Sequence, residues 1–204
     1  MYGIHDYPGF VLAVIVFLAI PGPGNLALIT STGQGGVRGG LAAAGGVIAG
    51  DQLLMWTAVA GLAAVLSASP RLFHLLQWGG AVYLAWLGLK MLRARPGAAP
   101  TLQMRPGHWF RQSMTITLLN PKAVMFYMAF FPLFVDPATH RGLPTFVLMA
   151  VTIATLTLAY CAIVIALTRH FADRLRASPR VGTWLQRTGG GLLLAFGLKL
   201  ALGR

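Results

Sequence analysis

Two charged residues stand inside apolar stretches of this chain. Asp51 lies about ten residues into the stretch 41–66, and Lys122 lies at a similar depth in the stretch 112–135. A helix rises about 1.5 Å per residue, so this depth corresponds to the middle of a membrane. A carboxylate there costs several kcal/mol of free energy if it is charged and unpaired. Asp51 therefore needs a proton or a cation.

Two interpretations of Asp51 remain open. In the first, Asp51 is structural and pairs with Lys122 or with hydrogen-bonding groups of the backbone. In the second, Asp51 alternately holds a proton and the ammonium group of a substrate. We favour the second, because acids inside membrane spans mostly lie on transport pathways. The two interpretations overlap, since an ion pair can also act as the switch.

Prolines interrupt two of the apolar stretches. The run Pro21-Gly22-Pro23-Gly24-Asn25 falls inside 9–30, and Asn120-Pro121-Lys122 falls inside 112–135. A proline within a helix removes a backbone donor and costs roughly 3 kcal/mol. Interrupted backbone persists in hydrocarbon only where it lines a cavity or is buried in protein. We therefore expect both helices to stop and restart part-way across the membrane, as helices at the central site of a transporter do.

The ends of such half-helices offer complementary groups to a substrate. An N-terminus presents free N–H groups and suits a carboxylate, whereas the carbonyls of a C-terminus suit a cation. Together with an acid nearby, these groups are complementary to a zwitterion such as an amino acid. The candidate site residues are Pro21, Pro23, Asn25, Asp51, Asn120, Pro121 and Lys122, and Thr30 and Thr155 are candidates for further polar contacts.

The composition is that of an integral membrane protein. Of 204 residues, 56% are hydrophobic and only 10% are charged, which is more apolar surface than a soluble domain of this size buries. The formal charge of +12 does not indicate nucleic-acid binding, because the basic residues cluster in loops between apolar segments. Cys161 is the single cysteine, so no internal disulfide forms. The first apolar run has no preceding Lys or Arg, and we expect it to be retained as a helix.

The fold we expect is an all-α membrane protein with six transmembrane helices, at about 9–30, 41–66, 71–91, 112–135, 144–168 and 185–203. Each stretch has about the 20 residues needed to cross a bilayer. The basic linker 93–111 divides a single domain, residues 1–204, into halves at about 1–92 and 112–204. Three spans in each half imply a 3+3 inverted repeat, with the first and fourth helices broken.

The distribution of Lys and Arg predicts the orientation. The first, third and fifth loops hold 1, 5 and 5 of these residues, whereas the second and fourth loops hold one each. The positive-inside rule then places the odd loops in the cytoplasm and both termini outside.

Rows of small residues predict close helix packing. Such rows occur at Ala42, Gly46 and Gly50, and at Gly80 and Gly88. They suit packing inside the chain or a homodimer face, and we favour packing. We interpret the aromatic residues Phe126, Tyr127, Phe130 and Phe131 as lipid-facing or packing residues.

Several kinds of chemistry lack their motifs. The five histidines show no metal-ligand spacing, no phosphate-binding loop is present, and no Ser/His/Asp set shares one depth. We therefore expect no metal, no cofactor, no ATP-driven transport and no enzymatic activity.

The motifs resemble one known family. Pro21-Gly22-Pro23, Gly50-Asp51, Gly79-Gly80-Ala81, Trp86-Leu87-Gly88-Leu89-Lys90, Leu119-Asn120-Pro121-Lys122-Ala123 and Phe130-Phe131-Pro132-Leu133-Phe134-Val135 are similar to the LysE/RhtB amino-acid exporters over nearly the whole chain. Phe126-Tyr127 after the Asn-Pro-Lys-Ala motif resembles the leucine-exporter branch. The resemblance implies a bacterial inner-membrane protein that exports neutral amino acids, leucine-like or threonine- and homoserine-like, by proton antiport.

Rival functions remain at this stage. An exporter of a small cation is the nearest, and it would be expected to hold more embedded acids or histidines than Asp51 alone. A channel or a non-transporting membrane protein needs no alternating access. A membrane-embedded enzyme would need a catalytic constellation that the sequence lacks.

Overall fold

A computed structural model describes residue 4, residues 6–68, 102–130, 134–135 and 142–176, and the single positions 78, 82, 86, 89, 92, 93 and 191. Apart from those single positions, the predicted third and sixth spans, 71–91 and 185–203, lie outside the described residues. So do Gly80, Gly88 and Phe131, and the side chain of Phe130. The described part is helical with one isolated bridge between Ile4 and Val135.

The first predicted break is confirmed. Helix α1 covers Tyr7–Ala19 and begins at the N-cap Asp6, whose carboxylate accepts a hydrogen bond from the Gly9 N–H at 2.9 Å. It ends at Ile20, which takes an extended conformation (φ −65°, ψ 118°), as the residue before a proline prefers to do. Helix α2 begins two residues after the first proline and covers Pro23–Ala68.

The predicted loop at 31–40 is almost entirely helical. α2 runs through this segment with one non-helical residue, Gly36 (φ 59°, ψ −149°), and its two arms fold back there. A positive φ of this kind is costly for a residue with a Cβ. The arms approach so closely that a Cβ on Gly39 would lie 2.3 Å from the Ser31 carbonyl oxygen. The chain therefore reverses direction at one glycine, Gly36, where a loop was expected.

The second predicted break is also confirmed. Helix α4 covers Trp109–Leu118, and α5 covers Pro121–Met125 and continues as a π-helix, η1, over Phe126–Phe130. Asn120 lies between α4 and α5 and caps α5, because its side-chain oxygen accepts a hydrogen bond from the Lys122 N–H at 3.1 Å. The last long helix, α6, covers Leu143–Arg176.

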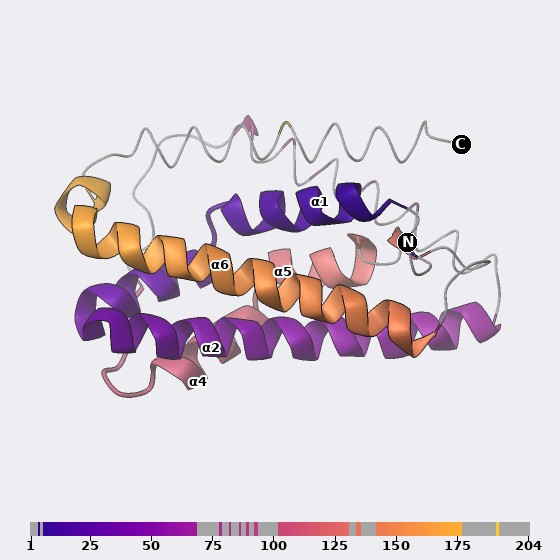
Figure 1. Cartoon of the computed structure of the whole chain (residues 1–204), viewed down its shortest axis with the longest axis horizontal. Coiled ribbons are helices and arrows are strands. Elements are labelled where there is room, and N and C mark those ends of the chain that lie inside the picture. Colours follow the sequence, from indigo (N-terminus) through magenta and orange to yellow (C-terminus); the bar gives the residue numbers. More distant parts are fainter. Residues whose placement is uncertain are drawn as a thin grey trace.

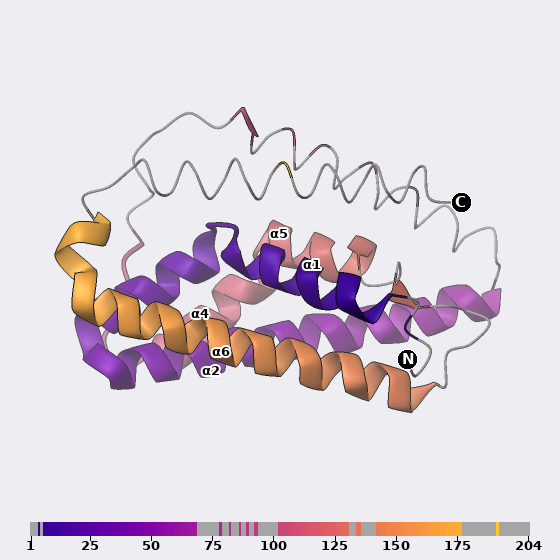
Figure 2. The ribbon, with the colours of Figure 1, turned by 45° about the horizontal axis from the view of Figure 1, so that its top comes forward.

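The helices lie side by side along the long axis of the molecule. Figures 1 and 2 show α1 and α6 running toward the end where α2 bends, whereas α4 and α5 run away from that end. The small-residue row of α2 packs against α4. A Cβ on Gly46 would lie 2.1 Å from the Phe110 carbonyl oxygen, and one on Gly50 would lie 2.8 Å from the Thr117 Cβ. Of the two roles considered for this row, packing inside the chain is therefore the one that Gly46 and Gly50 fill.

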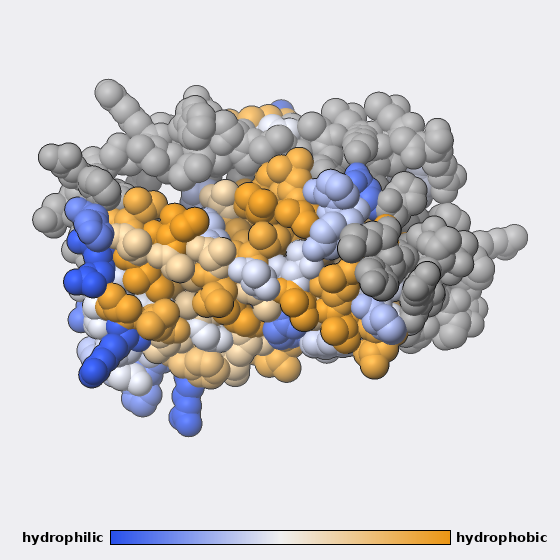
Figure 3. Space-filling model, in the orientation of Figure 1, coloured by the Kyte–Doolittle hydropathy of each residue, from blue (hydrophilic) through white to orange (hydrophobic). Residues whose placement is uncertain are grey.

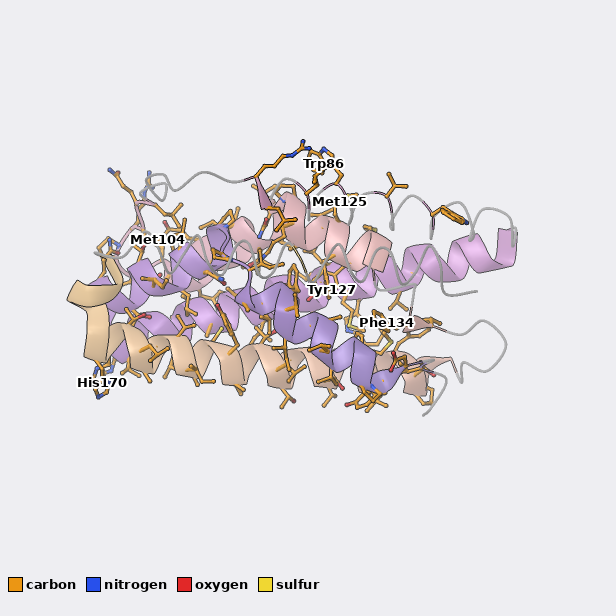
Figure 4. All side chains as sticks on the ribbon, turned by 90° about the horizontal axis from the view of Figure 1, so that it is seen from above. Trp86, Met104, Met125, Tyr127, Phe134 and His170 are labelled. Carbon is orange, nitrogen blue, oxygen red and sulfur yellow. The ribbon has the colours of Figure 1, made fainter. Side chains whose placement is uncertain are left out.

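Buried apolar side chains form two clusters along the axis. The larger contains Phe10, Met55, Phe134 and Met149, and the smaller contains Leu28, Ala43, Ala44, Cys161 and Ile165. Figure 4 shows Phe134 and His170 toward opposite ends of the bundle, with Tyr127 between them. The candidate site lies at the junction of the two clusters.

The described surface suits a lipid environment. Along α6 the large side chains of Val147, Val151, Leu158, Ile163 and Leu167 are exposed. Figure 3 shows a broad apolar face with hydrophilic residues at the end where α2 bends. Within the described residues, two stretches could cross a membrane by length and composition. They are Pro23–Gly61, which includes the bend, and Leu143–His170, with mean hydropathies of 1.2 and 2.3.

Candidate functional site

A cavity forms where the two breaks meet. Its volume open to the centre of a water-sized sphere is about 30 Å³. Five helices contribute to it, and its walls are formed by Phe17, Leu18, Gly24, Asn25, Leu28, Val47, Asp51, Thr117, Asn120, Lys122, Ala123, Thr157, Tyr160 and Cys161. Four predicted site residues, Asn25, Asp51, Asn120 and Lys122, thus come together around one space.

Lys122 closes the C-terminal end of α1. Its Nζ donates hydrogen bonds to the carbonyl oxygens of Ile20 at 2.8 Å and Phe17 at 3.1 Å. These carbonyls belong to the last turn of α1, where no intrahelical donor remains. The ammonium also lies 4.6 Å from the centre of the Phe17 ring, within cation–π range. The sequence predicted that carbonyls of a broken helix would hold a cation, and here they hold one from this chain.

Asn25 supports the same break from the other side. Its Nδ2 donates to the carbonyl oxygens of Leu18 and Ile20, each at 3.2 Å. Gly22 lies next to the Lys122 side chain, because a Cβ there would be only 3.4 Å from Nζ. Two polar side chains therefore satisfy carbonyls of Phe17, Leu18 and Ile20 that the break leaves without helical donors.

Asp51 is buried, with 3% of its surface exposed, on the return arm of α2. The Tyr127 hydroxyl donates a hydrogen bond to its carboxylate, and the positive charge of Lys122 acts on it electrostatically. The hydrogen bonds of Lys122 go to α1, so the two charged groups are neighbours that each keep other partners. The proximity of Lys122 fits the first interpretation of Asp51, as a structural partner of this cation. Because the Lys122 hydrogen bonds go to α1, the second interpretation, exchange of a proton for a substrate ammonium, stays open as well.

Of the two roles expected for Tyr127, packing is the one that the structure shows, because its ring belongs to the larger apolar cluster and contacts the rings of Phe17 and Phe126. Only 1% of its surface is exposed, and Figure 4 shows it in the middle of the bundle. The aromatic spacing gave no sign of this polar contact, which depends on how η1 packs against α2. Phe126 packs as expected too, because its ring stacks on that of Phe17 with 4.1 Å between centroids.

The prolines lie outside the cavity wall. Pro23 and Pro121 are exposed and Pro21 is half-buried, so they shape the breaks without lining the space. Thr30 and Thr155 are also absent from the wall, and Thr155 is exposed. The sequence analysis missed Thr117, Thr157, Tyr160 and Cys161. The i, i+4 spacing of Ile153, Thr157, Cys161 and Ile165, all buried, was an available signal for Thr157.

The site holds a polar group without a partner. The Thr157 hydroxyl is fully buried on α6 and makes no hydrogen bond to any described residue. The described residues contain no group of three His, Cys, Asp or Glu side chains that could hold a metal ion. The chemistry of the cavity therefore rests on one acid, one ammonium, two amides, hydroxyl groups and the Cys161 thiol.

Two broken helices that meet at a buried polar cavity define a helical membrane transporter. The chain belongs to the LysE type translocator family, whose model matches residues 15–204. It is therefore a transporter and not an enzyme.

Curated relatives cover nearly the whole chain. A leucine efflux protein of Salmonella typhimurium and an uncharacterized membrane protein of Pseudomonas aeruginosa are each 35% identical to it, over 98% of this chain and 96% of their own length. A leucine efflux protein of Klebsiella pneumoniae is 32% identical over 80% of this chain and 79% of its own. No solved structure matches the chain.

Proposed function

We propose that this protein exports neutral amino acids, leucine-like or threonine- and homoserine-like, from the cytoplasm across the bacterial inner membrane, driven by the proton motive force. The observation that carries the proposal is the meeting of Asp51 and Lys122 at one buried cavity between two helix breaks. An acid and a cation at one site complement the two charges of a zwitterion. The leucine efflux proteins among the relatives support the same substrate class.

In the proposed cycle, Asp51 exchanges a proton for the substrate ammonium. The substrate carboxylate binds at the N-terminal end of α2, near Gly24, where the first N–H groups have no intrahelical acceptor. It also lies near the Lys122 ammonium rather than the Lys122 N–H, because that N–H is already capped by Asn120. Gly24 and Lys122 both line the cavity. The broken helices then rock about the centre, so that the site opens to each side in turn. Pro21, Pro23 and Pro121 act by holding the breaks open.

We propose six spans in a 3+3 inverted repeat, with both termini outside. The opposite directions of α1 and of α4 with α5 support inverted halves (Figures 1 and 2). The orientation is supported by four exposed basic residues, Arg38, Arg105, Arg111 and Arg169. They belong to the bend of α2, the start of α4 and the last turns of α6, and these segments share one end of the bundle (Figure 1). The cycle needs only one copy of the chain, and the packing of Gly46 and Gly50 inside it leaves that row unavailable for a dimer.

An exporter of a small cation is the second candidate, but the Lys122 ammonium in the cavity wall opposes a bare cation. A channel is disfavoured because two breaks bridged by side-chain hydrogen bonds suit a gated site. These contacts would have to separate to form a continuous pore.

Counterflow in proteoliposomes tests the proposal. Vesicles are preloaded with unlabelled amino acids, and uptake of labelled leucine and threonine is followed with and without a pH gradient. We expect exchange of at least one of them, and net movement that responds to the gradient. If folded protein exchanges none of the neutral amino acids in a panel, this function is excluded and the cation exporter is favoured.

A further inference from the structure

We infer that the Thr157 hydroxyl binds the charged head group of the amino acid, and that it does so for every substrate regardless of its side chain. The inference rests on the proposed function and adds a residue to its site. Three observations carry it: the hydroxyl is buried, it has no partner, and it belongs to the cavity wall.

Four other threonines in the described helices behave differently. The hydroxyls of Thr32, Thr57, Thr115 and Thr152 each donate to the carbonyl oxygen four residues earlier in their own helix. This is the usual way for a threonine inside a helix to satisfy its hydroxyl. Thr157 has no such bond, although it lies in the regular middle of α6. A buried hydroxyl without a partner is unfavourable. Buried polar atoms of Ser31, Trp109 and Ser113 also lack a partner, but of these four described residues Thr157 alone lines the cavity, where a ligand can supply one.

The position of Thr157 along the bundle selects the head group over the side chain. On α6 it lies one turn from Ile153, in the larger apolar cluster, and one turn from Cys161, in the smaller one. Asp51 lies between the same two clusters on α2, with Met55 in one and Ala44 in the other. Thr157 therefore lies at the same position along the bundle as Asp51, which is proposed to bind the substrate ammonium. The apolar clusters on either side can contact the substrate side chain.

The helix that carries Thr157 also differs from the others at the site. Asn25 and Lys122 lie beside breaks, and their hydrogen bonds stabilise α1. α6 is continuous over 34 residues. Thr157 thus offers a fixed contact against which a head group can be held while the broken helices move.

The test compares Thr157→Val, Thr157→Ser and Thr155→Val. Valine keeps the shape of threonine and removes the hydroxyl, and serine keeps the hydroxyl. Thr155 is the matched control, because it lies on the same helix two residues away and is exposed. For each variant, the half-saturating concentrations of alanine, leucine and threonine are measured by counterflow. The thermal unfolding midpoint in detergent is measured with and without each amino acid.

We expect Thr157→Val to raise the half-saturating concentration about tenfold to a hundredfold, by a similar factor for all three amino acids. This corresponds to the loss of one hydrogen bond to a charged group. The same variant should unfold at an equal or higher temperature without ligand, because it no longer buries an unpaired hydroxyl. Thr157→Ser should stay within about threefold of the native protein, and Thr155→Val should leave both measurements unchanged.

Three results would overturn the inference. Native half-saturation in Thr157→Val would show that the hydroxyl binds no substrate. A lower unfolding midpoint together with weaker binding would assign Thr157 a structural role. A loss confined to threonine would place the hydroxyl against the substrate side chain. If the native protein moves none of the three amino acids, the proposed function has failed, and that failure is recognised without any variant.

Discussion

Replacing Lys122 by methionine tests how the two breaks are held together. Methionine has a similar length and removes the ammonium, so the carbonyl oxygens of Phe17 and Ile20 lose their donor. Hydrogen bonds to a charged group contribute about 1.5–3 kcal/mol each, and the cation–π contact adds roughly 1 kcal/mol. Relief of the desolvation of the half-buried Lys122 ammonium offsets part of this loss. We therefore expect a net decrease of about 2–3 kcal/mol in the free energy of unfolding.

The coupling between Lys122 and Asp51 gives a second prediction, because the Lys122 ammonium also compensates the negative charge of the Asp51 carboxylate. At an effective dielectric constant of about 20, two unit charges 4 Å apart interact by about 4 kcal/mol. The ammonium is directed at α1, so the coupling between Lys122 and Asp51 should be smaller, about 1–3 kcal/mol. Lys122→Met combined with Asp51→Asn should therefore destabilise the protein less than the sum of the single changes.

The assay is unfolding in mixed micelles by a denaturing detergent, followed by circular dichroism. Arg111→Met is the control, because Arg111 is a basic residue of α4 that is exposed. A native unfolding free energy for Lys122→Met, within about 0.5 kcal/mol, would refute the bridging of the breaks by Lys122. Additive effects in the double variant, to within the roughly 0.5 kcal/mol typical of independent sites, would refute the coupling.

Four further predictions follow from the same contacts. Asp51→Asn should abolish coupled transport in proteoliposomes while the protein still inserts and folds, and native flux would contradict its role. Asn25→Ala should lower the unfolding free energy by about 1–3 kcal/mol, because two carbonyls lose a donor; no change would mean that water replaces the amide. Gly46→Ala should cost about 3 kcal/mol, since its Cβ would meet the Phe110 backbone, whereas Gly45→Ala meets only the ring of Phe110 at 3.4 Å and should cost less than 1 kcal/mol; equal costs would contradict this packing. An imposed membrane potential without a pH gradient should move the amino acid toward the positive side, and no response would indicate electroneutral exchange.

The sequence predicted both breaks well because proline acts locally. Pro21 and Pro121 end a preceding helix whatever the tertiary structure, because proline has no N–H to donate and clashes with the turn before it. α1 and α4 therefore end within two or three residues of these prolines. The loop at 31–40 was predicted less well. Its glycines are needed for the close approach of two helical arms, and only Gly36 leaves the helical conformation. Composition alone does not distinguish these two uses of glycine.

The partners of the site residues could not be predicted, because they depend on packing between distant elements. Lys122 and Ile20 are separated by 102 positions, and their contact exists only when α5 lies against the end of α1. Tyr127 reaches Asp51 because the chain passes from α5 into η1, and a π-turn alters which face a residue occupies. Depth and residue type thus pointed to the two charged residues that line the cavity, Asp51 and Lys122. Tyr127 and Thr157 could be found only from the fold.

The charges of the site also indicate what kind of energy can drive the proposed export. With Asp51 ionised and Lys122 protonated, the two side chains together are neutral, and a bound zwitterion leaves them neutral. When Asp51 instead carries a proton, the site has one positive charge. If the site moves outward with substrate and inward with the proton, each cycle carries one positive charge into the cell. That step gains about 2.3 kcal/mol per 100 mV from an inside-negative potential, in addition to any pH gradient. Lys122 is essential to this balance, because without its charge the proton-loaded site would be neutral and the substrate-loaded site negative, and the protein would have to move a buried negative charge through hydrocarbon.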